Sequence, residues 1–105
     1  MSGTIFGLDQ RRWRGSRSAF FWTLQSMAAR AVDPRLAATL LERFTDEVHW
    51  LDLEAFTPSE QRELLVLLRD TPAAARRDLP AFDERDAVIA QIDRLIALVD
   101  GSEAP

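Results

Sequence analysis

Apolar side chains recur with a helical period along most of this chain. Between residues 34 and 52 they fall within roughly 140° of arc on a helical wheel, and polar residues occupy the opposite side. Asp33 is a favourable N-cap, and Pro34 fits the first helical position because its missing N–H needs no partner there. The stripe consists of Leu36, Ala37, Leu40, Leu41, Phe44, Val48 and Leu51. We expect an amphipathic helix from residue 34 to about residue 51.

An earlier segment has a similar pattern. Ser16 or Ser18 is placed to cap a helix that runs to about Val32. Its apolar residues follow the spacing i, i+4, i+7, i+8 and i+11, which is one face of a helix. They are Phe20, Leu24, Met27, Ala28 and Ala31, and Phe21 and Trp22 widen the face. This helix is expected to bury more than half of its circumference.

A third helical segment begins at Thr57. Thr57 is an N-cap, Pro58 takes the first helical position, and Glu60 is spaced to close a capping box. Residues 64–68 are consecutive apolar residues. A helix that is apolar on nearly all sides is expected at the centre of the fold or under a partner.

Two further signals follow. Thr71-Pro72 repeats the cap-and-proline pattern, which predicts a helix end and one extra helical turn over residues 73–77. Asp83 then caps a last helix, with acidic residues in its first turn where the helix dipole favours them. The stripe of this helix consists of Val88, Ile89, Ile92, Leu95, Ile96 and Val99.

The first 15 residues contain three glycines and show no sustained period, so they are expected to form an irregular arm. No segment competes as a strand. The sequence therefore predicts an all-α fold, a compact bundle of four main helices with a short extra helical turn and an irregular N-terminal arm. One domain covers 1–105, with the arm at 1–15 and a frayed tail at 101–105.

Composition narrows the possible chemistry. With 105 residues, the chain is too short for two ordinary domains. It has no cysteine, which excludes a disulfide framework, a thiolate metal site and a cysteine nucleophile. No signal-like segment and no 18-residue apolar run occurs, so we expect a cytoplasmic protein without a membrane partner.

His49 is the one histidine and the only candidate for imidazole chemistry. On the predicted helix, Asp46 and Asp52 lie three residues away on either side and can orient the ring, although a solvated helix face is the simpler interpretation. No glycine-rich phosphate loop, G-x-S-x-G serine or paired-histidine metal motif occurs. We therefore expect no enzymatic activity, no cofactor and no metal site.

Charge is divided unevenly along the chain, whose formal net charge is −4. Residues 1–30 hold five arginines and one acid, and the remainder is strongly acidic. The basic side chains near the start interleave with an aromatic ring, a pattern that can contact phosphates and stack on a base. They are Arg11, Arg12, Trp13, Arg14 and Arg17. Because the body is acidic, the favoured interpretation is an arm packed on that body, with Trp13 in a groove and the arginines paired with carboxylates. Nucleic-acid binding is the alternative.

A second constellation is acidic. It consists of Asp46, Glu47, His49, Trp50, Asp52, Glu54, Asp83, Glu84 and Asp86. Trp50 is expected at the edge of its helical stripe, partly exposed and ringed by charge, which is typical of an interface hot spot. A negative field of this kind speeds encounter with a basic partner. A solvated surface without a partner is the alternative.

Small size, excess acid and the lack of a catalytic motif predict a non-enzymatic protein-binding module. The leading hypothesis is a small inhibitor or immunity protein that neutralises a bacterial toxin or effector through an acidic helical surface, so the expected partner is a basic toxin or enzyme. Two alternatives stay open. One is a nucleic-acid-associated regulator that uses the Arg-rich arm, and the other is a structural or oligomeric helical protein, a homodimer included.

Overall fold

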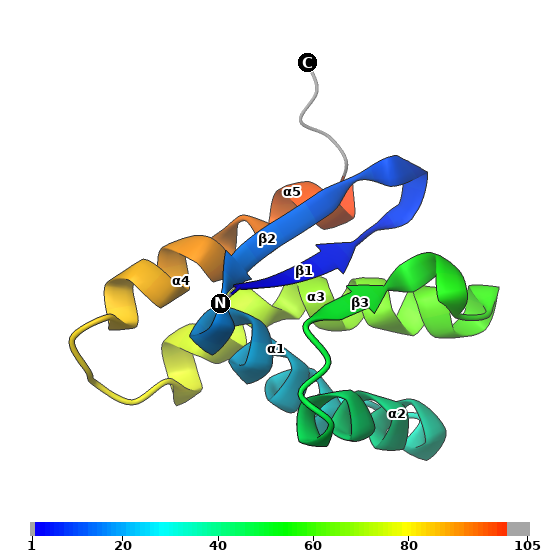
Figure 1. Cartoon of the computed structure of the whole chain (residues 1–105), viewed down its shortest axis with the longest axis horizontal. Helices are drawn as coiled ribbons and strands as arrows, with labels where there is room; N and C mark the ends of the chain where they lie inside the picture. The colour runs from blue at the N-terminus through cyan, green and yellow to red at the C-terminus, as the bar shows by residue number, and fades with distance from the viewer. Residues whose placement is uncertain (1, 101–105) are drawn as a thin grey trace.

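The computed structural model describes residues 2–100, which form a small sheet packed against helices (Figure 1). In chain order the elements are β1 (Ser2–Phe6), η1 (Leu8–Gln10), β2 (Arg12–Ser16), α1 (Arg17–Arg30), α2 (Pro34–Thr45), β3 (Trp50–Asp52), η2 (Leu53–Ala55), α3 (Pro58–Asp78), α4 (Arg85–Asp93) and α5 (Leu95–Asp100), where η marks a 3-10 helix. The fold is α+β, so the prediction of an all-α bundle is wrong. The tail at 101–105, expected to fray, lies outside the described residues.

The three strands lie in the order β2-β1-β3. β1 and β2 form an antiparallel hairpin in which Phe6 is opposite Arg12. β3 joins β1 in parallel from a distant part of the chain, with Thr4 opposite Trp50. The first residues of the chain are therefore a paired hairpin, and the prediction of an irregular arm is corrected.

One face of this hairpin supplies part of the core. Ile5 and Trp13 are opposite each other and point toward the helices, with exposed fractions of 0% and 3%. Glycine at position 3 allows β1 to lie directly on α1, because a Cβ there would be 2.2 Å from Cγ of Phe20. Inward side chains that alternate along both strands, together with backbone pairing across the sheet, stabilise this segment as strands.

Three of the predicted helix starts have the predicted caps. The prediction for the last helix is wrong, because the N-cap of α4 is Glu84, not Asp83, and its side chain makes no cap hydrogen bond. The side chain of Ser16 accepts a hydrogen bond at the start of α1, and that of Asp33 does so at the start of α2. Thr57 and Glu60 form both halves of the capping box at the start of α3. These predictions are confirmed, and they depend only on interactions within a few residues.

Helix ends differ from the predictions where distant contacts compete with the local pattern. α2 ends earlier than expected, because the chain turns back and its continuation pairs with β1 as β3. α3 continues through Pro72 to Asp78, so no separate helical turn forms. At this point the hydroxyl of Thr71 donates to the carbonyl oxygen of Leu67 at 2.7 Å. Pro72 itself has no N–H to donate to the carbonyl of Leu68, so the helix continues with one backbone bond fewer.

α1 lies at the centre of the fold and packs against α2, α3, α4 and the β1–β2 hairpin (Figure 1). α3, which the sequence placed at the centre of the fold or under a partner, has an exposed side in this chain: Leu64 and Leu68 are buried, but Val66 is 57% exposed. The last predicted helix is divided at Arg94 into α4 and α5. The largest fully buried side chains are Phe20, Ile5, Leu24, Met27, Leu36, Leu40, Leu51, Leu53, Leu64, Leu68, Ile92 and Leu95.

Candidate functional site

The sheet packs one face on the helices and leaves the other face open. Side chains alternate along a strand, so residues two apart share a face. On the open face, Thr4 of β1 lies between Arg14 of β2 and Trp50 of β3, and Phe6 lies beside Arg12. Phe6 and Trp50 are 38% and 48% exposed, which leaves two large aromatic rings at the surface of the sheet.

A third arginine reaches this face from the link between α4 and α5. Arg94 donates a hydrogen bond of 3.2 Å to the carbonyl oxygen of Arg14. Arg12, Arg14 and Arg94 line a hollow of about 490 Å³, and the remaining lining residues are Thr4 and Phe6. We call this surface the basic sheet face, and it consists of Thr4, Phe6, Arg12, Arg14, Trp50 and Arg94.

Within the described part of the chain, no ion pair neutralises the positive charge of the basic sheet face. Among the side chains that the structure describes, no carboxylate forms an ion pair with Arg12, Arg14 or Arg94. Arg14 is oriented by a neutral group, because its Nε donates to Oγ of Ser2 at 3.3 Å. Guanidinium groups that share a hollow repel one another, so an anion bound between them would relieve that repulsion. The planar fork of arginine also matches phosphate geometry.

The ring of Trp50 is held from one side. The guanidinium carbon of Arg43 lies 5.2 Å from the centroid of the Trp50 ring and 5.7 Å from that of Phe56. Nε of Arg43 is buried and has no hydrogen-bond partner within the described part of the chain. A cation over an aromatic ring is attracted to its negative face, so Arg43 restrains Trp50 while much of the ring stays exposed.

The basic segment identified in the sequence forms part of β2, so its side chains alternate between the two faces of the sheet. Arg11, Arg12 and Arg14 are exposed, and the last two belong to the basic sheet face. Trp13 points the opposite way into the core and cannot stack on a ligand. Burial of Trp13 agrees with the interpretation of an arm packed on its own body. Arg12 and Arg14, however, form no ion pair with a carboxylate of the described side chains.

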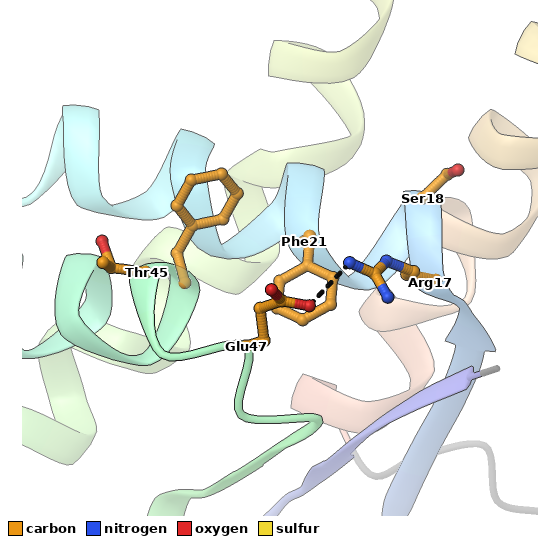
Figure 2. Close-up of a pocket in the computed structure, with 6 residues that line it drawn as sticks. Arg17, Ser18, Phe21, Thr45 and Glu47 are labelled. Atoms are coloured by element: carbon orange, nitrogen blue, oxygen red, sulfur yellow. Dashed lines mark hydrogen bonds and ion pairs between the residues drawn. The ribbon is translucent and has the colours of Figure 1, made fainter.

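Arg17 belongs to a different hollow, of about 490 Å³, between α1 and the turn after α2 (Figure 2). The rings of Phe21 and Phe44 line it with their centroids 5.9 Å apart, edge to face. Arg17 donates a hydrogen bond of 2.9 Å to Oε1 of Glu47, and Figure 2 shows this ion pair beside the Phe21 ring. Because the pair balances its two charges, the hollow offers little net charge to select an ionic ligand.

The residues of the predicted acidic surface fall into two groups. The first lies between the end of α2 and η2 and consists of Asp46, Glu47, His49, Trp50, Asp52 and Glu54. The second lies around the start of α4 and consists of Asp83, Glu84 and Asp86. Figure 1 shows β3 and the start of α4 well separated, so the two groups do not share one helical surface. Trp50 lies on a strand beside Arg43, not on a helix ringed by acids.

His49 lies in the extended link that precedes β3. Its ring contacts the edge of Phe21 at a centroid distance of 5.3 Å, and its carbonyl oxygen accepts a hydrogen bond from N of Thr4. Its Nδ1 is buried and has no hydrogen-bond partner among residues 2–100. Within the same range, no group of three or more acidic or histidine side chains is arranged to hold a metal ion. The observed contacts of His49 are thus packing contacts between α1 and the sheet.

Sequence reasoning missed three members of the basic sheet face, namely Thr4, Phe6 and Arg94. A local signal existed only in β2, because Arg12, Trp13 and Arg14 alternate between polar and apolar and Gly7 lies in the loop before them. In β1 the consecutive apolar residues Ile5 and Phe6 break the alternation. Arg94 had no local signal, because it reaches the face from a helix link far along the chain.

Comparison with protein-family models, curated proteins and solved structures found no match. None of the helices within the described residues combines the length and the hydrophobicity needed to cross a membrane.

Proposed function

We propose that this chain is a non-enzymatic nucleic-acid-binding module and that the basic sheet face contacts the phosphate backbone. One observation carries the proposal: Arg12, Arg14 and Arg94 line one hollow, without an ion pair to a carboxylate of the described side chains. Phosphate is the ligand that several arginines around one hollow suit best. The exposed Phe6 and Trp50 add aromatic surface, which proteins that bind single strands combine with basic grooves.

The net negative charge of the chain implies that only a small part of its surface contacts the nucleic acid. With a net charge of −4, most of the surface repels a polyanion, so the basic sheet face is the part that attracts one. Three or four phosphate contacts predict a salt dependence with a logarithmic slope of about −2 to −3 on single strands. Binding should therefore be measurable at low salt and weaken steeply as salt is added.

The test is a titration of fluorescently labelled 20-nucleotide DNA and RNA, each single-stranded and duplex, at several salt concentrations. The double variant Arg12→Gln/Arg14→Gln is expected to weaken binding by about tenfold or more and to flatten the salt dependence. Arg35→Gln/Arg62→Gln is the matched control, because it removes the same charge at two exposed arginines that do not line the hollow. Absence of salt-sensitive binding in the parent, or an equal loss in both double variants, would refute the proposal.

A protein-binding module remains the second candidate, in the form of an inhibitor or immunity protein. The observation that favours it is Trp50, which is 48% exposed, is restrained by Arg43 and has Asp52 and Glu54 close by in sequence. Tryptophan and arginine are the residues most enriched at interface hot spots.

The two candidates are separated by a pull-down from native lysate with and without nuclease treatment. A toxin or enzyme that stays bound after nuclease treatment, and is lost with Trp50→Ala, would favour the protein-binding module. A protein that disappears after nuclease treatment was held through nucleic acid and supports the first proposal.

A further inference from the structure

Three residues of the open face lie in a row across the sheet. Trp50 of β3 is opposite Thr4 of β1, and Thr4 is opposite Arg14 of β2. Neighbouring strands are about 4.8 Å apart, so the backbones at Trp50 and Arg14 are roughly 10 Å apart. Long side chains at both ends of this row shorten the gap between an aromatic ring and a guanidinium group. The aromatic ring and the guanidinium group can therefore bind a base and a nearby phosphate of the same nucleic-acid strand at the same time.

Trp50 is arranged to receive a base. Arg43 lies over its ring at 5.2 Å and also over Phe56, so the indole is held before any ligand arrives. Almost half of the residue nevertheless stays exposed. A ring that is already ordered loses little conformational freedom when a base stacks on it.

Resting on the proposed function, we infer that the ligand is a single-stranded segment, with one base stacked on Trp50 and a phosphate in the hollow of Arg12, Arg14 and Arg94. In a duplex the faces of the bases are stacked on one another and cannot meet an aromatic ring on a sheet. The β-strands β1, β2 and β3 have three to five residues and are about 10 to 17 Å long, so the sheet can contact only a few nucleotides.

The experiment uses the full chain and a labelled oligothymidylate of eight nucleotides, with a 12-base-pair duplex as the competing form. Trp50 is the exposed tryptophan, whereas Trp13 is buried and Trp22 is half-buried, so stacking is expected to quench mainly the Trp50 emission. The quenching should vanish in Trp50→Phe, while the affinity falls only a few-fold because phenylalanine can still stack.

Trp50→Ala is expected to weaken single-strand binding by about 5- to 100-fold, which corresponds to the loss of one base–aromatic stack. The salt slope should stay unchanged in this variant, because the phosphate contacts remain. Arg14→Gln should show the reverse behaviour, with a smaller slope and retained quenching at saturation. Phe82→Ala is the matched control, because Phe82 is a 40% exposed aromatic residue outside the sheet.

The outcomes distinguish a failure of this inference from a failure of the proposed function. Duplex binding as tight as single-strand binding, still dependent on Arg12 and Arg14, would overturn the inference and leave the proposed function standing. Single-strand binding that is insensitive to both Trp50 variants would also overturn the inference alone. If neither form binds in a salt-sensitive way, or if polyglutamate binds as tightly as the oligonucleotide, both fail. Circular dichroism of each variant verifies that the fold is retained.

Discussion

The indole Nε1 of Trp13 donates a hydrogen bond of 2.7 Å to the backbone carbonyl of Gln91, and the bond joins β2 to α4 across 78 positions of sequence. The side chain of the same glutamine accepts a hydrogen bond of 2.7 Å from N of Ser16. Arg94 adds a third bond along this edge through the carbonyl of Arg14. β2 is an edge strand, and these contacts from the α4–α5 region cover its outer edge.

Trp13→Ala should lower the free energy of unfolding by about 3–5 kcal/mol, because it empties a core position and removes the indole hydrogen bond to the Gln91 carbonyl, which keeps the N–H of Arg94 as a donor. Chemical denaturation followed by circular dichroism measures this loss. Trp50→Ala is the matched control, with an expected loss of about 1 kcal/mol or less at a half-exposed position. Similar losses in the two variants would mean that Trp13 does not anchor the hairpin.

Leu68→Ala should cost about 2–5 kcal/mol of unfolding free energy, because Leu68 is fully buried on the inner side of α3. Val66→Ala, two residues away on the exposed side, should change stability by about 0.5 kcal/mol or less. Both variants keep the helix and shorten one aliphatic side chain. A loss below about 1 kcal/mol for Leu68→Ala would contradict the observed packing of α3.

Gln10→Gly should stabilise the protein by about 0.5 kcal/mol. Gln10 has a φ of 67°, a left-handed conformation that is unfavourable for a residue with a Cβ, and part of the gain is offset by greater freedom in the unfolded chain. The same substitution at Gln25, an exposed position within α1, should instead destabilise by about 1 kcal/mol. Thermal and chemical unfolding of both variants measures the sign of each change in stability. A loss of stability in Gln10→Gly would show that the turn is not strained.

Asp93 should contribute to stability in a pH-dependent way. Two hydrogen bonds from Arg76, at 2.7 and 2.8 Å, hold the pKa of the Asp93 carboxyl below its ordinary range. Because the folded-state pKa is the lower one, the pair stabilises the fold above the unfolded carboxyl pKa. This contribution is lost as the pH falls through the folded pKa, in the acid range below about pH 4.

Carboxyl chemical shifts measured by NMR during an acid titration test this prediction directly. In Arg76→Gln the pKa of Asp93 should rise toward its ordinary range, and the difference in stability from the parent should shrink at low pH. Arg62→Gln is the control, because Arg62 is an exposed arginine on the same helix. An unchanged Asp93 titration in Arg76→Gln would disprove the assigned cause.

Local interactions in the sequence determined where α1, α2 and α3 begin. The capping residues Ser16, Asp33 and Thr57 each act within three residues of themselves, so their effect can be read without knowledge of the rest of the fold. The apolar stripes likewise identified much of the core, because the face of an amphipathic helix is fixed by its own spacing.

Only the tertiary structure decided which segments became strands and which side chains share a surface. Trp50 follows an apolar stripe with a helical period, yet it joins a sheet because Thr4, Ile5 and Phe6 offer it a backbone partner 46 positions away. Such pairing has no local period to reveal it, and it changed the expected neighbours of Trp50 from helix-borne acids to arginines. The sequence by itself determined the starts of α1, α2 and α3 and the excess of acid. The basic sheet face exists only because strand pairing and the packing of the α4–α5 link bring residues 4, 6, 12, 14, 50 and 94 together.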